Sequence, residues 1–338
     1  MKKLALVTLS FALIAIGLVT RIDAVSAQLI TQPNEQTIAD AYIYLLGRAL
    51  VIRQEHMDRG APGFAYNTIK YNPIGSADWV NPNLDTAYLE AWFAIDGDSS
   101  VIFEVPEIKD RYYTAQILDE WGEVITNINE RIFPSKPFGK FALVYPNSTV
   151  QIPSDAARIE LHSGKAKLLG RVEIKGDKEH ALKLQQAFKA TVSGTPTIKP
   201  PPAMRMFDNK NLIGVEIFDD IDTRLSSALD VAPNAAEMQQ KTRAAAAYAA
   251  SSQEARAKVD AQIRKIIPEF EEYAFTKSAP YRNHWVGGAA IGNYGANYRL
   301  RAVANYAGIW ANTIDEVIYF VATRDSNEQA LNGSSSYV

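Results

Sequence analysis

Short runs in which apolar and polar residues alternate dominate the chain between residues 64 and 174. Alternation with a period of two is typical of strands that bury one face. Turn signals separate the runs, and Asp96, Gly97 and Asp98 form one that predicts a hairpin in which residues 101–105 return beside residues 87–93. This spacing favours an antiparallel β-sandwich or jelly-roll-like domain. The expected strands are residues 64–70, 87–93, 101–105, 111–118, 124–128, 141–145, 158–161 and 168–174.

Helical periodicity flanks this β-rich region on both sides. Residues 34–56 repeat apolar side chains at the spacing of one helix face, and residues 211–276 do the same. Asp177 is a plausible N-cap for a helix that runs to about residue 191. We therefore predict an α+β protein. Its expected parts are an N-terminal helix with an antiparallel β domain (28–175), a helical connecting region (176–280) and the start of a second β domain, incomplete here (281–338).

The first 27 residues are typical of a cleavable secretory signal peptide. Lys2 and Lys3 precede an apolar run of about 16 residues, and small residues follow at the cleavage position before Gln28. The run is shorter than the roughly 20 residues that a spanning helix needs, so we expect export to the periplasm or medium rather than a membrane anchor. No later stretch is apolar enough to span a bilayer.

The composition narrows the classes of function. The 338 residues contain no Cys, which excludes disulfides, thiolate nucleophiles and Cys-based metal sites. A formal net charge of −3 gives no indication of nucleic acid as a partner. The four histidines show no metal-ligand spacing, although a divalent cation held by oxygen ligands would leave little trace in a sequence. No cofactor is identified.

The densest polar and aromatic segment spans residues 79–88, in a loop that enters an expected strand. Trp79, Asn81, Asn83, Asp85 and Tyr88 lie within it. Asn and Asp at such spacing commonly close turns through their own backbone. The alternative is that these side chains converge at the mouth of a pocket and bind a ligand.

A second such segment spans residues 111–121. On a strand, Tyr113 and Asp119 share one face, and Tyr112 and Gln116 share the other. Asp119 could be a buried acid suited to general acid–base work, or it could cap a turn or pair with Arg111. The remaining aromatic candidate for the pocket is Trp121.

Together these segments resemble a known family. The pattern Asn83, Asp85, Thr86 and Tyr88, followed by a strand and then the run from Arg111 to Trp121, is similar to the domain of unknown function 1254. Residues 295–302 and 319–337 resemble the start of its partner, the domain of unknown function 1214, which normally continues further. The resemblance implies exported β-sandwich domains joined by helices, and no specific reaction.

Three functions remain open. The aromatic residues could form a pocket for a small molecule or a glycan, oriented by Asn83, Asp85 and Gln116. Asp85 and Asp119 could instead act in a hydrolase, which for a glycosidic bond requires carboxyl groups about 5–10 Å apart. The third possibility is a structural or interaction module whose aromatics are core. We expect an enzyme-like pocket in which the two segments meet.

Overall fold

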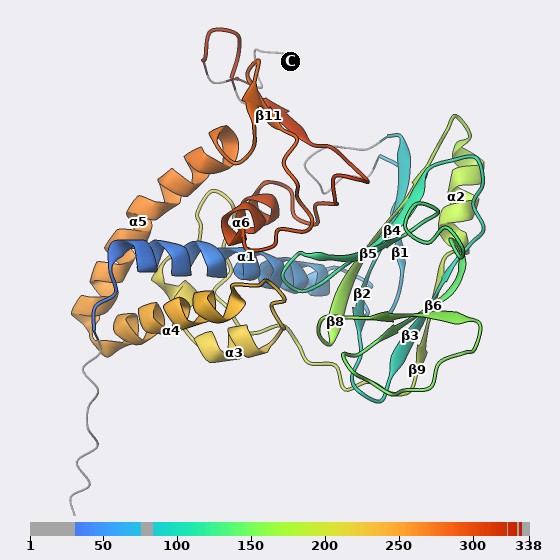
Figure 1. The fold of residues 1–338 in the computed structure, drawn as a ribbon, viewed down its shortest axis with the longest axis horizontal. Coiled ribbons are helices and arrows are strands. Elements are labelled where there is room, and N and C mark those ends of the chain that lie inside the picture. The colour runs from blue at the N-terminus through green and yellow to red at the C-terminus, as the bar shows by residue number, and fades with distance from the viewer. Residues whose placement is uncertain (1–30, 76–83, 323, 330, 333–338) are drawn as a thin grey trace, which may run out of the picture. The chain divides into compact units, whose positions relative to one another are not determined.

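Two β-sheets packed face to face form the part of the chain from Lys70 to Ser193 (Figure 1). The computed structural model describes residues 31–75, 84–322, 324–329 and 331–332. The five-stranded sheet is antiparallel and has the order β1 (Lys70–Tyr71), β2 (Thr86–Ala94), β8 (Lys165–Glu173), β4 (Tyr113–Leu118) and β5 (Val124–Ile128). The four-stranded sheet has the order β7 (Ala156–Glu160), β6 (Gly139–Val144), β3 (Ser100–Val105) and β9 (Lys189–Ser193), and only its β6–β7 pair is parallel.

The space between the sheets is filled by apolar side chains. Leu89, Ala91 and Phe93 alternate along β2 toward this core, and the ring of Phe93 lies 5.8 Å from that of Phe103 on β3. The opposite face of the five-stranded sheet carries Glu90, Lys167 and other polar residues, as the alternation of a strand dictates. The polar side chains of this sheet are therefore gathered on this second, outer face.

Helices cover the outer face (Figure 1). The first, α1 (Glu35–Gly60), begins where the Asn34 side chain accepts a hydrogen bond from the Thr37 N–H, which confirms the helix expected at residues 34–56. The other helices of this layer are the 3-10 turn η1 (Val215–Phe218), α3 (Ile221–Ser226), α4 (Ala235–Ser251), α5 (Gln253–Thr276) and α6 (Tyr298–Ala307), whereas α2 (Lys178–Ala187) packs against the core between the two sheets. Their shared core includes α1, α4, α5 and α6, and the whole of Gln32–Val338 groups as one compact unit.

The α+β class with antiparallel sheets is confirmed, but the expected hairpin is wrong. β3 does not return beside β2, because it lies in the other sheet between β6 and β9. The Asp96 side chain accepts hydrogen bonds from the Ser99 hydroxyl and the Thr197 N–H, so residues 95–99 form a link between the sheets.

Several other elements differ from the expected ones. Residues 64–69 form turns, and only Lys70–Tyr71 pairs as a strand. The helix after Asp177 ends at Ala187 and is followed by β9, which the sequence pattern did not indicate. Near the end of the chain, β10 (Tyr281–Arg282), β11 (Trp285–Gly287) and β12 (Phe320–Ala322) form a small three-stranded sheet. Residues 333–338, the end of the incomplete second β domain expected at 281–338, lie outside the described residues.

The expected signal peptide also lies outside the described residues. Within the described ranges, we find no helix whose length and apolarity would let it cross a membrane.

Candidate functional site

A cavity of about 720 Å³ lies against the outer face of the five-stranded sheet. Strands β2 and β8 contribute Tyr88, Leu169 and Arg171 to its floor. Its walls come from the end of α5, from α6 and the residues that follow it, and from β11 and β12. A volume of this size is typical of sites for small molecules.

The floor is organised by the strand register. Tyr88 on β2 and Thr114 on β4 flank Arg171 on β8, so that the three side chains lie side by side on the outer face. The Arg171 Nε donates to the Tyr88 hydroxyl at 3.4 Å, and its guanidinium lies 5.4 Å from the centre of the Tyr88 ring. Its Nη1 donates to Gln116 Oε1 at 3.1 Å. Three neighbouring strands therefore hold one arginine in place.

The wall opposite the floor is largely apolar. Leu300, Val303 and Ala304 on α6 line the cavity, and Trp310 lies beyond the helix end with its ring 5.4 Å from that of Trp92. The Gln116 Nε2 donates to the Ala311 carbonyl at 2.8 Å, which ties this segment to the sheet. Most of the surface offered to a ligand is hydrocarbon, with a few polar groups at the floor.

The segment after α6 is also conformationally strained. Ile309 has a φ of 33° and Trp310 a φ of 58°, in the left-handed region that non-glycine residues rarely adopt, β-branched ones least of all. Such conformations cost on the order of 1–3 kcal/mol each and persist only where the surroundings enforce them. Both residues line the cavity, so the strain lies at the proposed site itself.

The structure brings some of the expected site residues to this cavity. Asp85 and Tyr88 line it directly. Gln116 lies behind the cavity floor, where it contacts both Arg171 and the Ala311 carbonyl. Trp79, Asn81 and Asn83 lie outside the described residues. The first polar segment and the second therefore meet through Arg171.

Asp119 is not among the residues that line the cavity. Its Oδ1 accepts the N–H groups of Trp121 and Glu123, and its Oδ2 lies 2.7 Å from His162 Nδ1. The Ile174 N–H at the end of β8 donates to the Asp85 carbonyl. Leu118, which precedes Asp119, pairs with Lys167 near the other end of β8. The seven positions between Ile174 and Lys167 correspond to roughly 23 Å along a strand. The two carboxylates cannot share one glycosidic bond, because that chemistry requires a separation of about 5–10 Å.

The remaining candidates of the second segment make structural contacts. Arg111 donates to the carbonyls of Glu173 and Ile174 at the end of β8. The Tyr112 hydroxyl donates to Glu316, and the Tyr113 hydroxyl donates to the Pro137 carbonyl. None of these three is among the residues that line the cavity.

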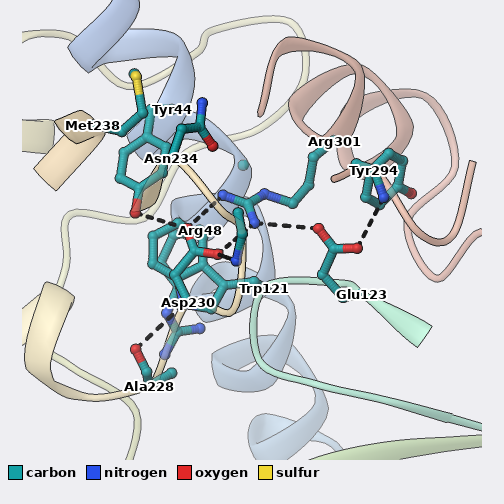
Figure 2. Close-up of polar contacts among 12 residues, drawn as sticks. Tyr44, Arg48, Trp121, Glu123, Ala228, Asp230, Asn234, Met238, Tyr294 and Arg301 are labelled. Carbon is teal, nitrogen blue, oxygen red and sulfur yellow. Dashed lines mark hydrogen bonds and ion pairs between the residues drawn. The ribbon is translucent and has the colours of Figure 1, made fainter. Parts of the chain in front are cut away.

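Trp121 belongs to a buried ionic cluster rather than to a pocket (Figure 2). The Arg301 guanidinium lies 4.6 Å from the Trp121 ring centre and forms ion pairs with Asp230 and Glu123. Burial raises the pKa of Glu123 to about 6, although the Tyr294 N–H and Arg301 oppose that rise. This cluster joins α6 to the turn between β4 and β5, and its carboxylates are already paired with Arg301.

Two residues with notable environments were not identified from the sequence. Arg171 is part of the row Lys165, Lys167, Leu169 and Arg171, whose side chains share the outer face of β8. The sequence offered little signal for this row, because Lys165 and Lys167 precede the strand expected at residues 168–174 and Arg171 follows Lys167 by four residues. His162, which follows the strand expected at residues 158–161, bonds to Asp119.

No group of three or more His, Asp or Glu side chains is arranged to hold a metal ion within the described ranges. Asp85 is an acidic residue that lines the cavity.

Comparisons with known proteins agree with this fold and leave the function open. Residues 64–192 match a family model described as "Protein of unknown function (DUF1254)". Among solved structures, the VPA0106 protein from Vibrio parahaemolyticus is similar with a TM-score of 0.53 and 16% identity, over 90% of this chain and 74% of that one. No curated protein shows significant similarity. The β-rich segment thus resembles the domain of unknown function 1254, as its motifs predicted, and the likeness to VPA0106 concerns the fold.

Proposed function

We propose that the protein binds a small, largely apolar molecule in the cavity between β2, β8 and α6. The observation that carries this proposal is an apolar cavity of about 720 Å³ whose polar groups are gathered at the floor. Ligand sites typically combine hydrophobic walls with a few placed polar groups in this way. The scarcity of polar groups on the walls favours an aliphatic or aromatic ligand over a glycan, which needs many hydrogen-bonding partners.

Burial of the ligand's apolar surface would supply most of the affinity. Each buried methylene contributes roughly 0.8 kcal/mol, so an alkyl chain of about ten carbons supplies roughly 8 kcal/mol before the costs of association, and net binding is expected to be weaker than micromolar. The strained backbone at Ile309 and Trp310 supports the same role, because such conformations are held in place by their surroundings and cluster at ligand-binding sites.

Calorimetric titration with decan-1-ol tests the proposal. We expect saturable binding to the native protein and a loss of at least tenfold in affinity for Ala307→Trp, since Ala307 lines the cavity at the end of α6 and is solvent-exposed. The matched control is Ala247→Trp, at an exposed position of α4 away from the cavity, which should bind as the native protein does. Absence of binding, or equal loss in both variants, would favour a structural or interaction module.

A hydrolytic role for the same cavity is a second candidate, favoured by one observation. Asp85 lines the cavity beside Tyr88, so a carboxylate adjoins the apolar space where a substrate would lie. Native protein that hydrolyses alkyl esters, with the activity abolished in Asp85→Asn but retained in Asp119→Asn, would establish this role. Equal activity in both variants would exclude Asp85 as the reacting group.

We also propose that the chain is exported with cleavage before Gln28, on the strength of its N-terminal sequence. Sequencing of the N-terminus of the protein recovered from the periplasm should begin at Gln28, and recovery of intact Met1 from the cytoplasm would contradict this. The likeness of residues 295–302 and 319–337 to the domain of unknown function 1214 is proposed on their motifs alone.

A further inference from the structure

The positive charge at the cavity floor belongs to Arg171. Among the residues that the structure describes, Arg171 forms no ion pair with a carboxylate, and its hydrogen-bond partners are the neutral oxygens of Tyr88 and Gln116. Its Nη2 has no hydrogen-bond partner in the same described ranges. Arg301, by contrast, is paired with two carboxylates in the ionic cluster.

A guanidinium in such a setting can bind an anion strongly. Arg171 is partly buried against apolar walls, where water screens its charge poorly. The attraction between its guanidinium and a bound anion is therefore stronger than it would be in bulk solvent. The planar fork of an arginine is suited to a carboxylate, which it can bind through two parallel hydrogen bonds. Tyr88, Thr114 and Gln116 restrain the side chain, so little conformational freedom would be lost on binding.

We propose that the ligand carries a single carboxylate, which binds Arg171 while its apolar body fills the space along α6. The inference rests on the proposed function, because it assigns a head group to a ligand of the same cavity. Asp85 also lines the cavity, and its carboxyl group disfavours a second negative charge on the ligand. A monocarboxylate with an aliphatic or aromatic body therefore fits better than a phosphate dianion.

Three probes of equal chain length separate the head group from the apolar body. Decanoate, decan-1-ol and decylammonium carry charges of −1, 0 and +1 at neutral pH, and their affinities for the full chain can be compared by calorimetry. We expect decanoate to bind about tenfold to a hundredfold more tightly than decan-1-ol, as charge-assisted hydrogen bonds typically contribute. Decylammonium should bind more weakly than either.

The variant Arg171→Gln assigns the preference to one residue. It should bind decanoate and decan-1-ol with similar affinity, because the preference for the carboxylate is lost. The control Lys175→Asn removes the same charge at an exposed position just beyond β8, where φ is 48° and Asn is well tolerated, and it should retain the native preference.

The possible outcomes distinguish the two proposals. If decan-1-ol binds as tightly as decanoate to the native protein, or if Arg171→Gln keeps the preference, the carboxylate assignment is overturned and the apolar site stands. If none of the three probes binds, the proposed function itself fails. Should Arg171→Gln not fold, the comparison of the three probes on the native protein and on Arg171→Lys, which keeps the charge, decides the assignment.

Discussion

The guanidinium of Arg301 binds both carboxylate oxygens of Asp230, each at 2.9 Å, and both side chains are almost fully excluded from solvent (Figure 2). Tyr44 on α1 donates to the same carboxylate at 2.7 Å. Glu123 in the turn between β4 and β5 lies 3.3 Å from Arg301. One arginine on α6 thereby connects the helices to the five-stranded sheet, and it fixes the helix whose side chains form the cavity wall.

Arg301→Met should lower the free energy of unfolding by about 3–5 kcal/mol, because it leaves Asp230 and Glu123 buried without a counter-ion. Urea denaturation followed by circular dichroism measures the change. The control is Arg264→Met, which removes an exposed ion pair with Asp260 on α5 and should cost at most about 1 kcal/mol. Similar losses in the two variants would contradict a central role for the buried pair.

Gly170→Ala should destabilise the sandwich by about 1–3 kcal/mol through overpacking. A Cβ atom at this position on β8 would lie 2.7 Å from the Leu89 Cγ atom of the neighbouring strand β2. Leu89→Ala removes the clash, so the double variant should be less destabilised than the sum of the single changes. Additive losses would show that the contact with Leu89 is not the cause.

Glu90 should make the protein less stable in acid. Burial alone would raise the pKa of this carboxyl group, but the charge of Lys167 and hydrogen bonds from Lys167 and Asn72 outweigh burial and lower the pKa from 4.5 to about 2. A depressed pKa in the folded state gives stability that is present above pH 4.5 and is lost as the pH falls toward 2. The expected loss is on the order of 3 kcal/mol.

Urea denaturation at pH 6 and pH 3 tests this dependence. The variant Glu90→Gln should lose less stability between the two pH values than the native protein, because it has no carboxylate at this position to protonate. The same loss in both proteins would refute the assignment.

His162 should remain protonated above its usual range. Burial lowers the pKa of this imidazole, but the hydrogen bond to Asp119 and the negative charges of Asp119 and Glu123 outweigh burial and raise the pKa above 6.5. This stabilisation is therefore fully present below pH 6.5 and is lost as the pH rises through the folded-state pKa. In Asp119→Asn the pKa of His162 should fall, measured from the imidazole proton shifts by NMR. The exposed control Asp155→Asn should leave it unchanged.

Local pattern predicted the elements well where one face is buried. The alternation along residues 113–118 correctly put Tyr113 and Gln116 on opposite faces, but Tyr113, expected at the pocket, lies in the sandwich core. The pairing partner of each strand was harder to predict, because pairing depends on contacts between distant parts of the chain. The pairing of β2 with β8 and the transfer of β3 to the second sheet have no signal within either segment.

Only part of the candidate site was predicted, because the sequence pattern shows local features and not contacts between distant residues. Asp85 and Tyr88 were identified because a dense polar and aromatic loop is visible locally. Arg171 lies 83 residues after Tyr88, and His162 lies 43 residues after Asp119, so only the folded sheet brings these pairs together. Trp121 was assigned to the pocket because sequence does not distinguish an aromatic that stacks on a ligand from one that stacks on a buried arginine.

A crystal structure of the protein with decanoate tests the central claim most directly. The account predicts electron density for the alkyl chain along α6 in the cavity, with the carboxylate within about 3 Å of the Arg171 guanidinium. A well-formed cavity that stays empty at saturating decanoate would contradict it.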